Sequence, residues 1–218
     1  MCGIGGFVDY EHDARRYAAA AKRMQRSLTP RGPDAEGDYQ DADAVLVHRR
    51  LTVIDPDGGT QPMYAPDGNT VLVYNGELYN TEEIRKDLLA RGHTFRGHSD
   101  TEVLLHAFLE WDTDAFERLN GIFAFAIWQK KERRLVLCRD RLGVKPLFVA
   151  RLQDGIVFGS TIGAVLCHPA VEPEVDEDGL RAVLLLGPAR PPAPGVFRQI
   201  DSLLPGHYAD LTPEGYAD

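Results

Sequence analysis

Short apolar runs separated by polar turns recur along the chain, and they predict a protein rich in short strands. The runs cover residues 3–9, 44–55, 70–76, 122–128, 133–140, 146–151 and 155–160. The run Ile-Phe-Ala-Phe-Ala-Ile-Trp at 122–128 is apolar at every position, which is typical of a strand covered on both faces. Because the runs are close together in sequence, we expect antiparallel strands in two stacked sheets, with helices grouped outside.

Helical patterns lie between and around these runs. The clearest helix start is at Ser99, where a good N-cap residue is followed by Glu102 in a capping box and by an apolar stripe that ends at Trp111. Asn80 and Glu83 repeat the capping signal ahead of a second helix. Further helices are predicted over 13–28, 113–120, 160–168 and 176–186.

Three segments rich in proline and glycine are predicted loops: 29–37, 56–69 and 187–195. In the first of them, composition favours a solvent-exposed pair for Arg31 and Asp34. The Asn75-Gly76 dipeptide, which ends the run that begins at residue 70, most often forms a hairpin turn. The residues after it predict a helix start rather than a returning strand.

Length and charge limit the class of protein. A chain of 218 residues suffices for one large domain or two small ones. Its net charge of −9 argues against sequence-independent binding to nucleic acid or to an anionic membrane. No apolar run reaches the roughly 18–20 residues of a membrane helix. The N-terminus lacks the basic segment of a signal peptide, so we expect a cytoplasmic protein.

The three cysteines, Cys2, Cys138 and Cys167, show no metal-ligand spacing, which argues against a disulfide framework and a zinc site. Cys138 and Cys167 are predicted to be small buried thiols. Cys2 differs because removal of Met1 would place a free amine and a thiol on one residue. Their reference pKa values, about 7.7–8.0 and about 8.5, are close enough for the amine to take the thiol's proton. Taken alone, a cysteine at position 2 is more often an ordinary small residue than a nucleophile.

Two charged positions have weak local explanations. Arg49 and Arg50 interrupt an apolar strand, so one of them must point toward the interior or a cleft, where it needs an anionic partner. Asp100 stands at the first position of a predicted helix, where the helix dipole alone could account for it. Asn75 and Gly76, at the end of a strand, could provide two hydrogen-bond donors to an oxyanion.

Nine motifs occur in order along the chain: MCGIGGF, RGPDAEG, RRLTVID, GGTQPM, NGELYN, SDTEVLLHAF, NGIFAFAIW, RDRLGVKPLF and FGS. Together they make the chain similar to the glutaminase domain of class II glutamine amidotransferases, in particular that of glutamine-dependent asparagine synthetases. The resemblance covers residues 2–208, and 209–218 would begin a linker to a synthetase domain. It implies an α+β, N-terminal-nucleophile hydrolase fold, an αββα four-layer sandwich of two antiparallel sheets.

The resemblance also implies site roles. Cys2 would be the nucleophile, and Asn75 and Gly76 would form the oxyanion hole. Arg50 would hold the α-carboxylate of glutamine and Asp100 its ammonium group. The other implied glutamine-binding residues are Leu51, Thr52, Val53, Ile54 and Glu77.

The implied reaction is glutamine hydrolysis through a thioester, which releases glutamate and supplies ammonia for amidation of aspartate. The implied partners are L-glutamine and a C-terminal synthetase domain or subunit, and a homodimer is left open. No metal or cofactor is expected in this chain, which lacks an SGGxDS-type loop; ATP and magnesium are expected in the synthetase domain. Two alternatives remain: a glutaminase that serves another amide-forming ligase, and a catalytically silent scaffold of the kind found in β-lactam synthetases.

Overall fold

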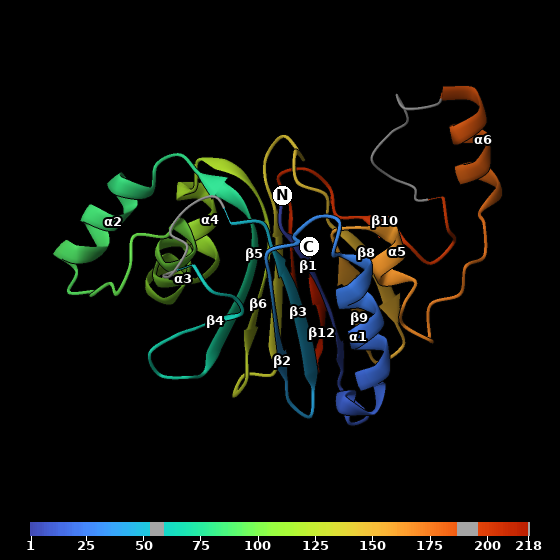
Figure 1. Cartoon of the computed structure of the whole chain (residues 1–218), viewed down its shortest axis with the longest axis horizontal. Helices are drawn as coiled ribbons and strands as arrows, with labels where there is room; N and C mark the ends of the chain where they lie inside the picture. The colour runs from blue at the N-terminus through green and yellow to red at the C-terminus, as the bar shows by residue number, and fades with distance from the viewer. Residues whose placement is uncertain (53–58, 187–195, 218) are drawn as a thin grey trace.

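Two antiparallel sheets of six strands each pack face to face in a computed structural model that describes residues 1–52, 59–186 and 196–217 (Figure 1). The first sheet has the strand order β10 (Asp201–Ser202), β8 (Phe148–Leu152), β9 (Gly155–Gly159), β1 (Gly3–Asp9), β3 (Ala44–Arg50) and β2 (Ala35–Gln40). The second sheet has the order β12 (Gly215–Ala217), β11 (Tyr208–Thr212), β7 (Arg134–Arg139), β6 (Gly121–Gln129), β5 (Thr70–Leu78) and β4 (Met63–Tyr64).

Helices cover the outer face of each sheet (Figure 1). The second sheet packs against α2 (Thr81–Ala90), α3 (Asp100–Trp111) and α4 (Ala115–Arg118), with a 3-10 turn (Asp112–Asp114) before α4. The first sheet packs against α1 (Ala18–Ser27), which follows a 3-10 turn (Ala14–Tyr17), and against α5 (Ile162–Val165). A further helix, α6 (Glu177–Leu186), lies to one side of the sandwich. The expected αββα layering is confirmed.

The alternation of β6 side chains explains why that strand is apolar throughout. Ala124, Ala126 and Trp128 face the core between the two sheets, whereas Phe125 and Ile127 face the core under the helices. All five side chains are fully buried. The prediction of a strand covered on both faces is therefore confirmed.

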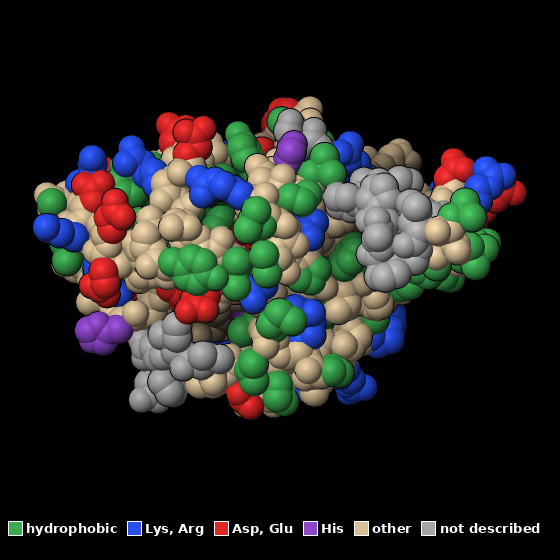
Figure 2. Space-filling model, turned by 90° about the horizontal axis from the view of Figure 1, so that it is seen from above, with side chains coloured by type: hydrophobic (Ala, Val, Ile, Leu, Met, Phe, Trp, Pro, Cys, Tyr) green, Lys and Arg blue, Asp and Glu red, His purple; other side chains and the backbone are tan. Residues whose placement is uncertain are grey.

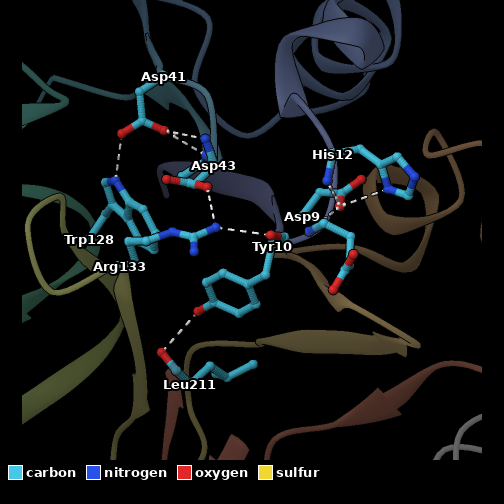
Figure 3. Close-up of polar contacts among 10 residues, drawn as sticks. Asp9, Tyr10, His12, Asp41, Asp43, Trp128, Arg133 and Leu211 are labelled. Atoms are coloured by element: carbon cyan, nitrogen blue, oxygen red, sulfur yellow. Dashed lines mark hydrogen bonds and ion pairs between the residues drawn. The ribbon is translucent and has the colours of Figure 1, made fainter. Parts of the chain in front are cut away.

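Polar contacts join the sheets at the end of the sandwich where β1 finishes (Figure 3). The indole of Trp128 donates to Asp41 at 2.8 Å, and the Arg133 guanidinium donates to Asp43 at 2.6 Å and to the Tyr10 carbonyl at 2.9 Å. The Tyr10 hydroxyl donates to the carbonyl of Leu211. These contacts close one end of the sandwich. An opening between the sheets is therefore expected at the opposite end, where β1 begins at Gly3.

Several boundaries differ from the sequence prediction. Strands β2 and β4 occupy parts of predicted loops, and β3 ends at Arg50 instead of continuing. Strand β5 runs through Asn75-Gly76 to Leu78, so the expected strand end there was wrong. Gly76 pairs with Phe123 of β6, and a Cβ at Gly76 would lie 2.5 Å from the Ile122 carbonyl oxygen. This glycine therefore permits close strand approach instead of making a turn.

The cap predictions hold in part. Ser99 accepts a hydrogen bond from the Glu102 amide, but the Glu102 carboxylate binds the amides of Arg96 and Gly97 instead of closing a box. Asn80 precedes α2 without a side-chain cap; it bonds the backbone of 118 and 120. Cys138 is buried as predicted, whereas Cys167 is half-buried. The predicted continuation of the 44–55 strand beyond 52 and the loop 187–195 lie outside the described residues.

None of the described helices is long and apolar enough to cross a membrane. On the face shown in Figure 2, Lys and Arg side chains stand in separate groups among acidic and hydrophobic ones. The described residues of this face therefore show no large cluster of basic side chains, which agrees with the acidic net charge of the chain.

Stability should fall in mild acid because two buried histidines resist protonation. Burial lowers the pKa of both His48 and His168 to about 4. The unfolded chain binds these protons near pH 6.5, so stability is lost as pH falls from about 6.5 toward 4, by up to about 1.4 kcal/mol per pH unit for each histidine. Urea unfolding at several pH values measures this slope. His48→Gln should flatten it, and a flattening as large in the exposed-site control His207→Gln would contradict the assignment.

Candidate active site

A cavity opens at the end of the sandwich where β1 begins. Its described lining consists of Met1, Cys2, Arg50, Leu51, Gly59, Gln61, Tyr74, Asn75, Gly76, Glu77, Ser99, Asp100, Thr101 and Lys145. Seven of the predicted site residues are therefore brought together, from Cys2 to Asp100. Thr52 is described but does not line the cavity, and Val53 and Ile54 lie outside the described residues.

Cys2 directly precedes β1, a strand in the middle of the first sheet. Its thiol lies 3.7 Å from the Leu51 carbonyl oxygen, and its own carbonyl accepts a hydrogen bond from Arg31 at 3.0 Å. Cys2 is half-buried and its thiol is free, whereas Met1 is 57% exposed. The bond that must be cut to free the Cys2 amine is thus near the surface, while the thiol lines the cavity.

The loop from Arg31 to Asp34 holds the strand ends around Cys2 and Arg50. A Cβ at Gly32 would collide with the Arg49 carbonyl group, so only glycine lets the loop approach β3 this closely. The Asp34 amide donates to the Arg50 carbonyl at 3.0 Å, and the Asp34 carboxylate accepts from the Thr52 amide at 2.8 Å. Arg31 and Asp34 are therefore structural anchors of the site: Asp34 is exposed as composition favoured, whereas Arg31 is half-buried and binds the Cys2 carbonyl.

Hydrogen-bond directions along β5 place two donors at the cavity. The Tyr79 amide donates to the Asn120 carbonyl next to β6. Odd-numbered residues of β5 therefore direct their backbone N–H and C=O groups toward β6, and even-numbered residues direct theirs toward the other edge. In the described chain β4 pairs with β5 only as far as Leu72, so the Gly76 N–H points to the cavity and not to a strand.

Asn75 supplies the second donor. Its side chain is 1% exposed, and among the described residues its amide nitrogen Nδ2 has no hydrogen-bond partner. A buried amide without a partner costs roughly 1–3 kcal/mol, so its retention indicates a partner that binds there. The two adjacent donors, Asn75 Nδ2 and Gly76 N–H, can bind one oxygen that bears negative charge.

Asp100 lies at the N-terminus of α3 on the free edge of β5. Its Oδ2 accepts from the Tyr74 hydroxyl at 2.8 Å and from the Leu78 amide at 3.1 Å. Burial, and next the Asp100 charge, hold the pKa of Tyr74 well above its usual value, so this hydroxyl remains a donor. These two bonds orient the carboxylate at the cavity wall, and Asp100 as a whole residue is 9% exposed.

No histidine lines the cavity in the described part of the chain. The buried His48 instead faces the Tyr74 carbonyl oxygen at 3.2 Å, and its lowered pKa keeps it neutral. Within that same part, no group of three or more His, Cys, Asp or Glu residues could hold a metal ion. After Met1 is removed, the α-amine of Cys2 is on the same residue as the thiol, so it is the base available to take the thiol's proton.

Sequence reasoning assigned no role to Gln61, Tyr74 or Lys145, although all three line the cavity. Gln61 accepts from the Tyr74 amide at 2.6 Å and so holds the edge of β5. Gln61 and Lys145 stand in the motifs GGTQPM and RLGVKP, which were the available signal. The residues next to Gln61 and Lys145 in sequence do not indicate that these two side chains line the cavity with Cys2.

The arrangement of a half-buried N-terminal cysteine, an oxyanion donor pair and opposed buried charges between two sheets is that of a class of amidotransferases. The chain belongs to the glutamine amidotransferase domain family, whose sequence model matches residues 1–217. It is 45% identical to "Asparagine synthetase [glutamine-hydrolyzing] 3" of Bacillus subtilis, over 99% of this chain and 35% of that protein. "Asparagine synthetase [glutamine-hydrolyzing] 1" of the same species is 32% identical over 99% of this chain and 34% of that protein.

The chain thus spans about a third of the length of these curated relatives. Among solved structures, the B. subtilis glutamine phosphoribosylpyrophosphate amidotransferase shares the fold with a TM-score of 0.61 at 17% identity, covering 99% of this chain and 48% of that one. A second, titled the allosteric regulatory enzyme of purine biosynthesis, gives 0.64 at 18% identity, with 99% and 48% coverage. The predicted N-terminal-nucleophile hydrolase fold is confirmed.

Proposed function

We propose that this chain hydrolyses the side-chain amide of L-glutamine through a thioester on Cys2. The supporting observation is the match between the cavity and the charges of the substrate. Free glutamine carries one α-carboxylate and one α-ammonium group, and the cavity offers the guanidinium of Arg50 and the carboxylate of Asp100. Arg–carboxylate contacts are often bidentate, so they fix orientation as well as supplying affinity.

The reaction follows from these positions. After Met1 is removed, the Cys2 amine takes the thiol proton and the thiolate attacks the amide carbon. The carbonyl oxygen becomes an oxyanion that Asn75 Nδ2 and the Gly76 N–H stabilise. Collapse of this intermediate breaks the C–N bond, and ammonia leaves with the proton held by the amine. Water then attacks the thioester, which releases glutamate and restores the thiol.

The proposed fate of the ammonia is ATP-dependent amidation of aspartate in a synthetase domain or subunit. The support is the identity with the two glutamine-hydrolysing asparagine synthetases, of which this chain covers about a third. ATP and magnesium would bind in that domain. Residues 209–217, which were expected to begin the linker to it, instead belong to β11 and β12 of the second sheet. A ligase that amidates another acid would use the same glutaminase chemistry. We expect the reaction to take place in the cytoplasm.

The substrate assignment is tested by blocking the α-groups. Free L-glutamine should be hydrolysed, whereas N-acetyl-L-glutamine and glutamine α-amide should lose about 100-fold or more in kcat/KM, because each lacks one of the two charges that Asp100 and Arg50 would bind. Glutamate release, measured on protein whose mass confirms loss of Met1, gives the comparison. Equal hydrolysis of all three compounds would contradict roles for Arg50 and Asp100, and no hydrolysis of glutamine would contradict the proposed function.

A further inference from the structure

Two charged residues of the described cavity lining, Glu77 and Lys145, have no task in this reaction; Glu77 is exposed, whereas Lys145 is buried. Its side chain is 9% exposed, and within the described chain its ammonium group has no hydrogen bond or ion pair. The residue lines the cavity, and its side-chain nitrogen is not among the fully enclosed polar atoms that lack a partner in the described chain. A charge buried to this degree without a partner is costly, so its retention here indicates a negatively charged group that binds in the cavity.

The backbone around Lys145 is held rigidly. The carboxylate of Asp140, itself 1% exposed, accepts hydrogen bonds from the amides of Phe123, Leu142, Val144 and Lys145 at 2.9–3.2 Å. The Arg139 guanidinium donates to the Lys145 carbonyl at 2.8 Å and to the Gly143 carbonyl at 2.7 Å. The loop therefore presents Lys145 at a defined position instead of leaving it to move in solvent.

Strand order places Lys145 across the cavity from Arg50. In the first sheet, β3 ends at Arg50 on one side of β1, while β9 and then β8, which follows Lys145, lie on the other side. In the second sheet, Asp100 binds the free edge of β5, whereas the Asp140 that holds Lys145 binds Phe123 of β6 on the opposite edge. Cys2 and Asn75 lie between these two sides.

A glutamine held by Arg50 and Asp100 at its α-groups extends its side-chain amide toward Cys2 and Asn75. Lys145 is then at the amide end of the substrate, where negative charge develops, and not at the α-carboxylate end.

We propose that the ammonium of Lys145 stabilises the negative charge of the tetrahedral intermediate formed on Cys2, together with the donors at Asn75 and Gly76. The inference rests on the proposed glutaminase function. A cation placed near a developing oxyanion favours the transition state over the neutral amide of the ground state. The effect should therefore appear in kcat and not in KM.

The test compares Lys145→Met, which keeps the length of the chain but removes its charge, with Lys145→Gln, Lys145→Arg and the wild type. We expect the first two variants to lose about 10- to 100-fold in kcat for glutamate release, with KM within about threefold. Lys145→Arg should retain most of the activity. The exposed Lys131→Met, at the far end of the sandwich, is the matched control and should equal the wild type. Thermal unfolding of each variant is measured alongside.

Three outcomes would overturn the inference: wild-type kcat in both neutral variants, a loss confined to KM, or recovery of kcat when Glu77→Gln is added to Lys145→Met. The last would show that Lys145 only neutralises Glu77. An inactive wild type would count against the glutaminase function itself. An active wild type with an unaffected Lys145→Met would contradict only the role of Lys145.

Discussion

Cys2→Ala should release no glutamate from glutamine above the uncatalysed background, a loss of at least about 10⁴-fold. The substitution removes the sulfur that forms the thioester, and no other nucleophilic thiol lines the described cavity. Glutamine should still bind, because Arg50 and Asp100 remain. Coupled glutamate detection measures the rate, and calorimetric titration measures binding.

The matched control is Cys167→Ala, at a half-buried free thiol beside α5 that is not part of the cavity. This variant should keep full activity. A glutamine-analogue electrophile such as diazo-oxo-norleucine should label Cys2 in the wild type and leave Cys2→Ala unlabelled. Undiminished glutamate release by Cys2→Ala would disprove the thioester mechanism.

Asn75→Ala should lower kcat by about 10²- to 10³-fold with little change in KM. The reason is that Nδ2 of Asn75 has no partner among the described residues, so its hydrogen bond is available for the oxyanion that exists only during the reaction. Steady-state kinetics with glutamine separate the two parameters. The variant should fold, since the lost amide nitrogen makes no hydrogen bond within the described chain.

Asn69→Ala is an informative comparison at the other end of the same strand. Asn69 donates to Glu132 at 2.8 Å and accepts from the Lys131 amide at 3.0 Å, far along β5 from the cavity. Its loss should lower the melting temperature and leave kcat unchanged. If kcat in Asn75→Ala fell only in proportion to stability, or if the loss were entirely in KM, Asn75 would not be an oxyanion donor.

The layers of the fold could be predicted because apolar periodicity reports burial directly, as the fully apolar β6 shows. The missed strands lack that signal. In β2, Ala-Glu-Gly-Asp-Tyr-Gln, one residue of six is buried, and the strand forms because its backbone pairs with β3. The two residues of β4 pair with β5 in the same way. Backbone pairing of an edge strand leaves little trace in side-chain pattern.

Site residues could be predicted where a residue type did not fit the secondary structure expected from its neighbours in sequence. Arg50 interrupts an apolar strand, and Asn75-Gly76 precedes a helix start instead of a returning strand. Lys145 and Gln61 show no such conflict, because their positions depend on loops anchored by Asp140 and by the free edge of β5. Gly76 was assigned to a strand end because the close approach of Phe123 is a contact between distant segments.

The hydrogen bond from Arg31 to the carbonyl of Cys2 bears on how the chain matures. In the described chain, this hydrogen bond and the strand pairing that begins at Gly3 both lie on the carboxyl side of the bond between Met1 and Cys2. Trimming the first residue therefore leaves the anchorage untouched and only exposes a new amine. Folding and N-terminal processing become independent events, so the chain can complete either one first and reach the same mature geometry.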